Sequence, residues 1–183
     1  MASTPPSSHF LLPRRAMLLG LAGFATACSI SPTRMGAATP PNVLFICQAG
    51  TVKSPVAREL FKRRAKERGL VANVTARGIT PEEHMSPKLL AAALADGIDP
   101  KIEPVRQLAI EDMRAADLVI YFDRPPFASE FPGALDWTDL PSMNDDYPGT
   151  RAIILKRSEP LIDGLLIAPT AHRHQPAKMT PSI

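Results

Sequence analysis

The stretch that decides the fold is Val43-Leu44-Phe45-Ile46-Cys47-Gln48-Ala49-Gly50-Thr51-Val52-Lys53-Ser54-Pro55. It opens with an uninterrupted apolar run, residues 43–46, which is typical of a parallel strand buried on both faces. It closes with Ser54-Pro55, a helix-start signal in which Ser is the N-cap and Pro takes the first helical position. The sequence therefore predicts a buried strand, a short loop and a helix in immediate succession.

The loop between this strand and this helix has the features of an anion-binding site. Backbone N–H groups at a helix N-terminus point at one spot, and the helix dipole adds partial positive charge there. Cys47 would lie beneath an oxyanion at that spot, and the same N–H groups would stabilise its thiolate. A thiolate so placed can attack phosphorus. A lone cysteine is often a small buried hydrophobe, but the position of Cys47 between a strand and a helix start favours the anion-loop role.

The rest of the chain alternates between strand and helix patterns. Residues 71–77 alternate polar and apolar side chains, and residues 118–122 form a second continuous apolar run. Helices are expected over residues 54–68, 86–96, 109–115 and 148–166. The last of them contains Pro160, which should kink or shorten it. This alternation predicts βαβ units and a mostly parallel sheet, with ligands bound beyond the carboxyl ends of the strands.

The pattern Cys-x5-basic-Ser-Pro after a strand, from Cys47 to Pro55, resembles the signature of low-molecular-weight protein tyrosine phosphatases and the related arsenate reductases. Further segments resemble that family in the same order: residues 76–79, 84–87, 95–99 and 116–123. The resemblance covers about residues 42–166. It implies an α/β fold with three αβα layers around a small, mostly parallel four-stranded sheet, Rossmann-like and of the phosphotyrosine phosphatase I type.

The resemblance also assigns roles in the loop. Cys47 would be the nucleophile that forms a phosphocysteine, and Ser54 would hydrogen-bond its thiolate. The phosphate would be bound by Gln48, Ala49, Gly50, Thr51, Val52 and Lys53. Gly50 stands where the family commonly has an Asn at positive φ, a conformation that Gly adopts freely, and Ala49 stands at a usual Gly.

Lys53 is the main departure from the family pattern, because it stands where the family has a phosphate-clamping Arg. Arg grips two phosphate oxygens with a planar fork, whereas Lys offers a point charge on a flexible stem. Losing one charge-assisted hydrogen bond costs about 1.5–3 kcal/mol, which corresponds to roughly a ten- to hundredfold effect.

The general acid is ambiguous in the sequence. The family takes an Asp from a loop near the end of the sheet. One register makes Asp139 this acid. Another register places Ser142 at the position and leaves Asp145 as a substitute, although Asp145 and Asp146 are also suited to capping the last helix.

The first forty residues are expected to be an export signal and a linker. Arg14-Arg15 precede an apolar run of about a dozen residues, too short to span ~30 Å of hydrocarbon, and the pair resembles a twin-arginine signal. Residues 25–28, Ala-Thr-Ala-Cys, also resemble a bacterial lipobox, which would make Cys28 a lipidated N-terminus. The alternative is ordinary cleavage near Ala27 or near Ala37-Ala38.

This organisation predicts an export signal over residues 1–28, a linker over 29–41, the phosphatase-like domain over 42–166 and a disordered tail over 167–183. The mature protein would be periplasmic or lipid-anchored at the cell envelope of a bacterium. Contact with a membrane would come only through a lipid on Cys28.

Composition narrows the function classes. With 21 basic and 18 acidic residues and no basic–aromatic run, the chain lacks the pattern of a nucleic-acid-binding protein. Two cysteines and four histidines without ligand spacing indicate neither a disulfide scaffold nor a metal site, and no cofactor is expected.

Three functions remain. The first is a cysteine-dependent phosphomonoesterase acting on phosphotyrosine or a phosphorylated small molecule. The second is a non-catalytic oxyanion-binding module of the same fold. The third, ranked last, is an arsenate reductase that uses an external thiol, because no cysteine follows Cys47 in the chain.

Overall fold

The computed structural model describes residues 39–167. The predicted export signal, most of the predicted linker and the tail beyond residue 167 lie outside the described residues. Within them the chain forms four strands, four α-helices and one short 3₁₀ helix: β1 (Asn42–Cys47), α1 (Lys53–Glu67), β2 (Asn73–Gly78), α2 (Pro87–Ala95), α3 (Ile110–Ala115), β3 (Leu118–Tyr121), η1 (Ala128–Glu130), β4 (Leu135–Asp136) and α4 (Tyr147–Ile167).

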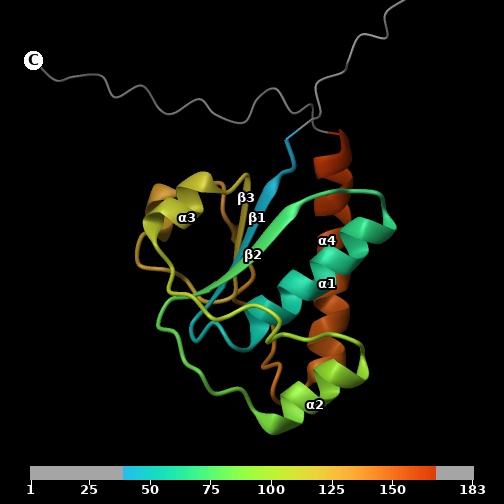
Figure 1. Cartoon of the computed structure of the whole chain (residues 1–183). Helices are drawn as coiled ribbons and strands as arrows, with labels where there is room; N and C mark the ends of the chain where they lie inside the picture. Colours follow the sequence, from blue (N-terminus) through green and yellow to red (C-terminus); the bar gives the residue numbers. More distant parts are fainter. Residues whose placement is uncertain (1–38, 168–183) are drawn as a thin grey trace, which may run out of the picture. The chain divides into compact units, whose positions relative to one another are not determined.

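The strands form one parallel sheet with the order β2-β1-β3-β4 (Figure 1). The predicted fold class, an α/β fold with a small four-stranded sheet, is confirmed. In the register of the sheet, Cys47 lies opposite Gly78 of β2, and Ile46 lies opposite Tyr121 of β3. The carboxyl ends of these strands therefore meet at one edge, and the loop after Cys47 starts there.

Two hydrophobic cores cover the two faces of the sheet, because successive side chains of a strand point to opposite faces. Val43, Phe45 and Cys47 pack in the core that α1, α2 and α4 help to form. Leu44 and Ile46 pack in the smaller core with residues of α3 and η1. Figure 1 shows α3 on one side of the strands and α1 and α4 on the other, which gives the three layers that were predicted.

Phe45 is the centre of an aromatic cluster in the larger core. Its ring lies 5.7 Å from that of Phe61 in an edge-to-face arrangement, and 6.1 and 6.4 Å from the rings of Phe122 and Trp137. Phe45 comes from β1, Phe61 from α1, and Phe122 directly follows β3. The cluster therefore fixes β1, and with it Cys47, against the helix that follows the loop.

Helix boundaries agree with the sequence expectations at some ends and differ at others. The side chain of Ser86 caps α2 by accepting a hydrogen bond from Leu89 N, as its Ser-Pro start predicts. In contrast, α1 begins at Lys53, so Ser54 lies inside the first turn and is not the N-cap. The expected shortening of the last helix is wrong, because α4 continues through Pro160 to Ile167.

Substituting Phe45 with Ala should cost the domain about 3–5 kcal/mol of unfolding free energy, since the side chain is fully buried and the cavity would open at the centre of the aromatic cluster. Urea denaturation of the chain measures this cost. Phe45→Leu is the matched control and should cost clearly less, because it leaves a smaller void. A loss below about 1 kcal/mol for Phe45→Ala would contradict the central role of this ring.

Candidate active site

Cys47 forms the floor of the candidate site as the last residue of β1. Its side chain is buried, and its Sγ lies 3.1 Å from the Oγ of Ser54. The same Ser54 Oγ lies 3.3 Å from the backbone oxygen of Arg77, to which it can donate. Because Ser54 has only one hydroxyl proton, it can donate either to a Cys47 thiolate or to the Arg77 carbonyl. The neutral thiol fits the second arrangement, in which Sγ–H donates to Ser54 Oγ.

The carbonyl groups at the start of the loop are bound by the segment that follows β2. Ile79 N donates to the carbonyl of Cys47 at 3.0 Å, Thr80 N to that of Gln48 at 2.8 Å, and Glu82 N to that of Ala49 at 3.0 Å. These bonds hold the start of the loop along the edge of the sheet and fix the orientation of its peptide groups.

The N–H groups of residues 49–53 donate to no acceptor within residues 39–167. This is unusual for a segment in which Gly50 and Thr51 are buried, because buried backbone N–H groups are nearly always paired. We call residues 48–53, which follow Cys47 and lead into the N-terminus of α1, the cup; N–H groups without a protein acceptor at such a position are the kind of donor that binds anions. Phosphate binding by residues 48–53 stays a prediction.

Gly50 gives the cup its shape. Its φ is +71°, in the left-handed region that was expected at this position. A Cβ at residue 50 would lie 2.7 Å from a methyl group of Val105 and 3.0 Å from the backbone of Gly78. Residue 50 therefore requires Gly for two reasons, its backbone conformation and the close approach of Gly78.

Lys53, the residue in the place of the family's Arg, lies at the first position of α1. Its Nζ donates to the carbonyl oxygen of Leu140 at 3.2 Å. The bond ties the cup to the loop that precedes α4. In this arrangement one of the three ammonium N–H groups donates to the protein, and two further donors belong to the same group.

A pocket of about 220 Å³ opens beside the cup. Its lining comes from the cup, from the end of β3 and from the loop before α4: Cys47, Gln48, Ala49, Val52, Lys53, Asp123, Ser142, Met143 and Asn144. The structure thus brings Cys47 and Lys53 to one pocket, with Ser54 beneath them. It is large enough for a phosphate group and a part of the group that carries it.

Asp139, predicted in one register to be the general acid, is not among the residues that line this pocket. Its carboxylate forms a two-pronged ion pair with Arg157 of α4, with N–O distances of 2.8 and 2.6 Å. The hydrogen bonds from Arg157 hold the pKa of Asp139 below its usual value, whereas a general acid needs a pKa that keeps its proton near neutral pH. The geometry therefore does not support this role for Asp139.

The other register fits the structure better, because Ser142 lines the pocket. Asp145 is exposed and lies outside the lining. Asp146 caps α4, as its Oδ1 accepts a hydrogen bond from Gly149 N at 2.9 Å. The helix-capping interpretation is thus confirmed for Asp146.

Sequence reasoning missed Asp123. Its Oδ2 accepts a hydrogen bond from Gln48 N at 2.8 Å, so it holds the first peptide group of the loop. The signal was present in the sequence, because Asp123 comes directly after a buried strand in a parallel sheet. Only the register of β3 beside β1 shows that this carboxylate reaches the loop.

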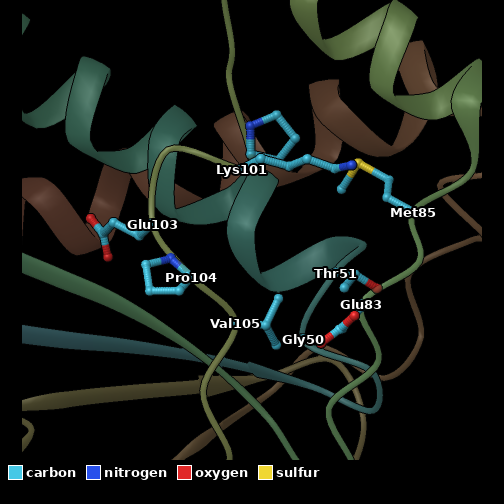
Figure 2. Close-up of a pocket in the computed structure, with 9 residues that line it drawn as sticks. Gly50, Thr51, Glu83, Met85, Lys101, Glu103, Pro104 and Val105 are labelled. Carbon is cyan, nitrogen blue, oxygen red and sulfur yellow. The ribbon is translucent and has the colours of Figure 1, made fainter.

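Another pocket, of about 310 Å³, is lined in part by the same loop (Figure 2). Gly50 and Thr51 contribute to it, together with Glu83, Met85, Lys101 and neighbouring residues of the segment 100–105. The Oγ1 of Thr51 is buried and has no hydrogen-bond partner in the structure. Within residues 39–167 no group of three His, Cys, Asp or Glu side chains is arranged to hold a metal ion.

The structure is thus an α/β domain with a cysteine at the end of β1 and, directly after it, a loop whose N–H groups at residues 49–53 have no acceptor within residues 39–167. The sequence profile described as low molecular weight phosphotyrosine protein phosphatase matches residues 42–129. This match confirms the resemblance seen in the sequence over that part of the chain. No curated protein matches the chain.

Several solved structures share this fold. A YwlE mutant from Bacillus subtilis is 24% identical, with a TM-score of 0.58 over 69% of this chain and 99% of its own. A low molecular weight protein tyrosine phosphatase from Bacillus subtilis is 23% identical, with a TM-score of 0.56 over 68% of this chain and 97% of its own.

An arsenate reductase in the phosphate binding state is also similar. It is 20% identical, with a TM-score of 0.56 over 68% of this chain and 98% of its own. At these identities the likeness to solved structures establishes a shared fold.

Substituting Gly50 with Ala should destabilise the domain more than the same change at Gly69. Both glycines have a positive φ, which costs a residue with a Cβ about 1–2 kcal/mol. Only Gly50 adds a clash with the backbone of Gly78, since nothing lies within 4 Å of a Cβ at Gly69. Urea denaturation of the two variants isolates the packing contribution. Equal losses for both would show that the loop tolerates a Cβ at residue 50.

Proposed function

We propose that this domain is a cysteine-dependent phosphate-monoester hydrolase that works through a phosphocysteine at Cys47. The observation that carries the proposal is the set of N–H groups of residues 49–53, which follow Cys47 and have no acceptor within residues 39–167. A phosphate with three anionic or partly anionic oxygens satisfies such donors. The match to the family profile supports the same chemistry.

In the first step the Cys47 thiolate attacks phosphorus, the S–P bond forms, and the P–O bond to the leaving group breaks with its electron pair going to oxygen. In the second step water attacks phosphorus, the S–P bond breaks, and inorganic phosphate leaves while Sγ returns as a thiolate. The N–H groups of the cup stabilise the transferred phosphoryl group in both steps.

Ser54 assists the departure of sulfur in the second step. As negative charge develops on Sγ, the hydroxyl of Ser54 can turn from the Arg77 carbonyl and donate to Sγ over the 3.1 Å that separates them. This hydrogen bond is made most strongly by the charged sulfur, so it favours the transition state over the covalent intermediate.

Lys53 supplies the side-chain cation of the site. Lys53 lines the pocket and gives one of its three N–H groups to the Leu140 carbonyl, so its remaining donors serve a phosphate oxygen. A point charge holds one oxygen where the fork of an Arg would hold two. Turnover is therefore expected to be lower than an Arg at this position would give.

A second candidate is a phosphate-binding module without turnover. Two observations favour it: Leu140 takes one hydrogen bond of Lys53, and Asp139 pairs with Arg157 and is not among the residues that line the pocket. Reduction of arsenate is a weaker candidate, because Cys47 is the only cysteine in residues 39–167 and an external thiol would have to complete the reaction.

Hydrolysis of p-nitrophenyl phosphate tests the proposal. We expect a measurable rate that Cys47→Ser abolishes, because the variant lacks the thiolate. Lys53→Arg should raise kcat roughly ten- to a hundredfold by restoring the second charge-assisted hydrogen bond. Leu140 interacts with Lys53 through its backbone carbonyl, so Leu140→Met serves as a control that should leave the rate nearly unchanged.

The binding module makes the opposite prediction. Inorganic phosphate would raise the melting temperature of the chain, while no hydrolysis would depend on Cys47. That outcome would refute the hydrolase and support the module.

We also propose that the domain is exported, on the evidence of the Arg14-Arg15 pair and the apolar run that follows it. None of the helices in residues 39–167 combines the length and the apolar composition needed to cross a bilayer. Residues 1–41 fused to a reporter that is active only in the periplasm should give signal, and Arg14→Lys with Arg15→Lys should remove it if the twin-arginine route is used. Cys28→Ala distinguishes a lipidated product from a cleaved one, because only lipidation needs the thiol.

A further inference from the structure

The carboxylates near the cup decide how a leaving group can be protonated. All 18 acidic residues of the chain lie within residues 39–167, so the structure places every one of them. Of these, only Asp123 is among the residues that line the pocket beside Cys47. The choice of a general acid in this pocket therefore rests on Asp123 and on the wall opposite the cup.

Asp123 is occupied with holding the loop. Its Oδ2 accepts the hydrogen bond from Gln48 N at 2.8 Å, and Gln48 is the first residue of the cup. Oδ2 accepts in this bond and therefore carries no proton. We take Oδ1 to be a carboxylate oxygen as well, and Asp123→Asn tests that assignment. The contact makes Asp123 a positioning residue for the Cys47–Gln48 peptide group.

The wall opposite the cup is neutral. It consists of Ser142, Met143 and Asn144, and none of these side chains is an acid of useful strength near neutral pH. The carboxylates on either side of the wall bind other groups of the protein: Asp139 pairs with Arg157, and Asp146 caps α4. Asp145 is exposed and outside the lining.

We infer that the site takes phosphate compounds whose leaving group departs without being protonated: acyl phosphates and the esters of strongly acidic phenols or enols. This inference rests on the proposed function. When Cys47 attacks, the S–P bond forms and the P–O bond breaks, and the electron pair stays on the leaving oxygen as a carboxylate or phenolate anion. No proton donor is then needed for the step to balance.

The same reasoning disfavours esters with basic leaving groups. The phenol of tyrosine has a pKa of about 10, and alcohols are less acidic still. Their oxygens leave as anions only slowly. A positioned general acid accelerates such reactions about 10²–10⁴-fold. A site without a general acid lacks this acceleration.

The test is a series of aryl phosphates from dinitrophenyl phosphate to phenyl phosphate, with acetyl phosphate added. The measured quantity is kcat/KM, because it reports the first chemical step and is not masked by slow breakdown of the phosphocysteine. We expect log(kcat/KM) for the unmodified protein to fall steeply as the pKa of the leaving phenol rises.

Ser142→Asp places a carboxyl group in the neutral wall and should flatten this dependence. It should raise kcat/KM for phenyl phosphate by roughly 10²-fold or more while changing dinitrophenyl phosphate little. Ser142→Asn is the matched control, since it has nearly the same shape as Asp and no acidic proton, and it should leave the dependence steep.

Two results would overturn the inference without touching the proposed function. One is Cys47-dependent hydrolysis of phenyl phosphate within about tenfold of dinitrophenyl phosphate, a ratio far smaller than an absent general acid allows. The other is a fall of log(kcat/KM) with leaving-group pKa that is shallow in the unmodified protein and steep in Asp123→Asn. This variant keeps an oxygen for Gln48 N but removes the carboxyl group, so the result would identify Asp123 as the general acid. If instead no compound in the series is hydrolysed in a Cys47-dependent way, the proposed function itself fails, and the inference falls with it.

Discussion

The N–H groups of residues 49–53 must remain without protein acceptors, and the rest of the site depends on how the fold achieves this. The carbonyl groups of residues 47–49 are bound by the segment after β2, so the peptide groups at the start of the loop have a fixed orientation. Gly50 turns the chain with a positive φ, and Gly78 lets the two backbones approach closely. Unpaired buried donors destabilise a folded protein. An anion that accepted hydrogen bonds from them would offset this loss of stability.

The wall opposite the cup is anchored to the scaffold through charged side chains. Lys53 holds the carbonyl of Leu140 from the side of the cup, and Asp139 is paired with Arg157 from the side of α4. The guanidinium of Arg157 also lies over the ring of Trp137, 5.7 Å from its centroid. The loop before α4 is therefore bonded both to Lys53, at the end of the cup, and to Arg157 of α4.

The match to the family profile bears on the nucleophile of this domain, whereas the residues peculiar to this chain bear on its substrates. Under the proposed function, the fold and the Cys47–Ser54 pair determine which atom attacks. The residues around the leaving group determine which bond can be broken at a useful rate. The residues of the pocket depart from the family pattern at Lys53 and at Ser142. Under the proposal, the chain therefore keeps the nucleophile of the family but differs in the substrates that it can use.

The sequence by itself determined the order of strands and helices and the place of the anion loop, because hydrophobic periodicity and the Cys-x5-Lys-Ser-Pro pattern are local signals. It misplaced Ser54 as an N-cap, since the bonds that hold this hydroxyl come from Cys47 and Arg77. Only the tertiary structure decided which groups Asp123 and Asp139 bind. Asp123 accepts a hydrogen bond from Gln48 because β3 lies beside β1, and Asp139 pairs with Arg157 because α4 packs against its loop. Contacts between residues distant in the chain depend on the register of the sheet and the packing of helices, which no local pattern encodes.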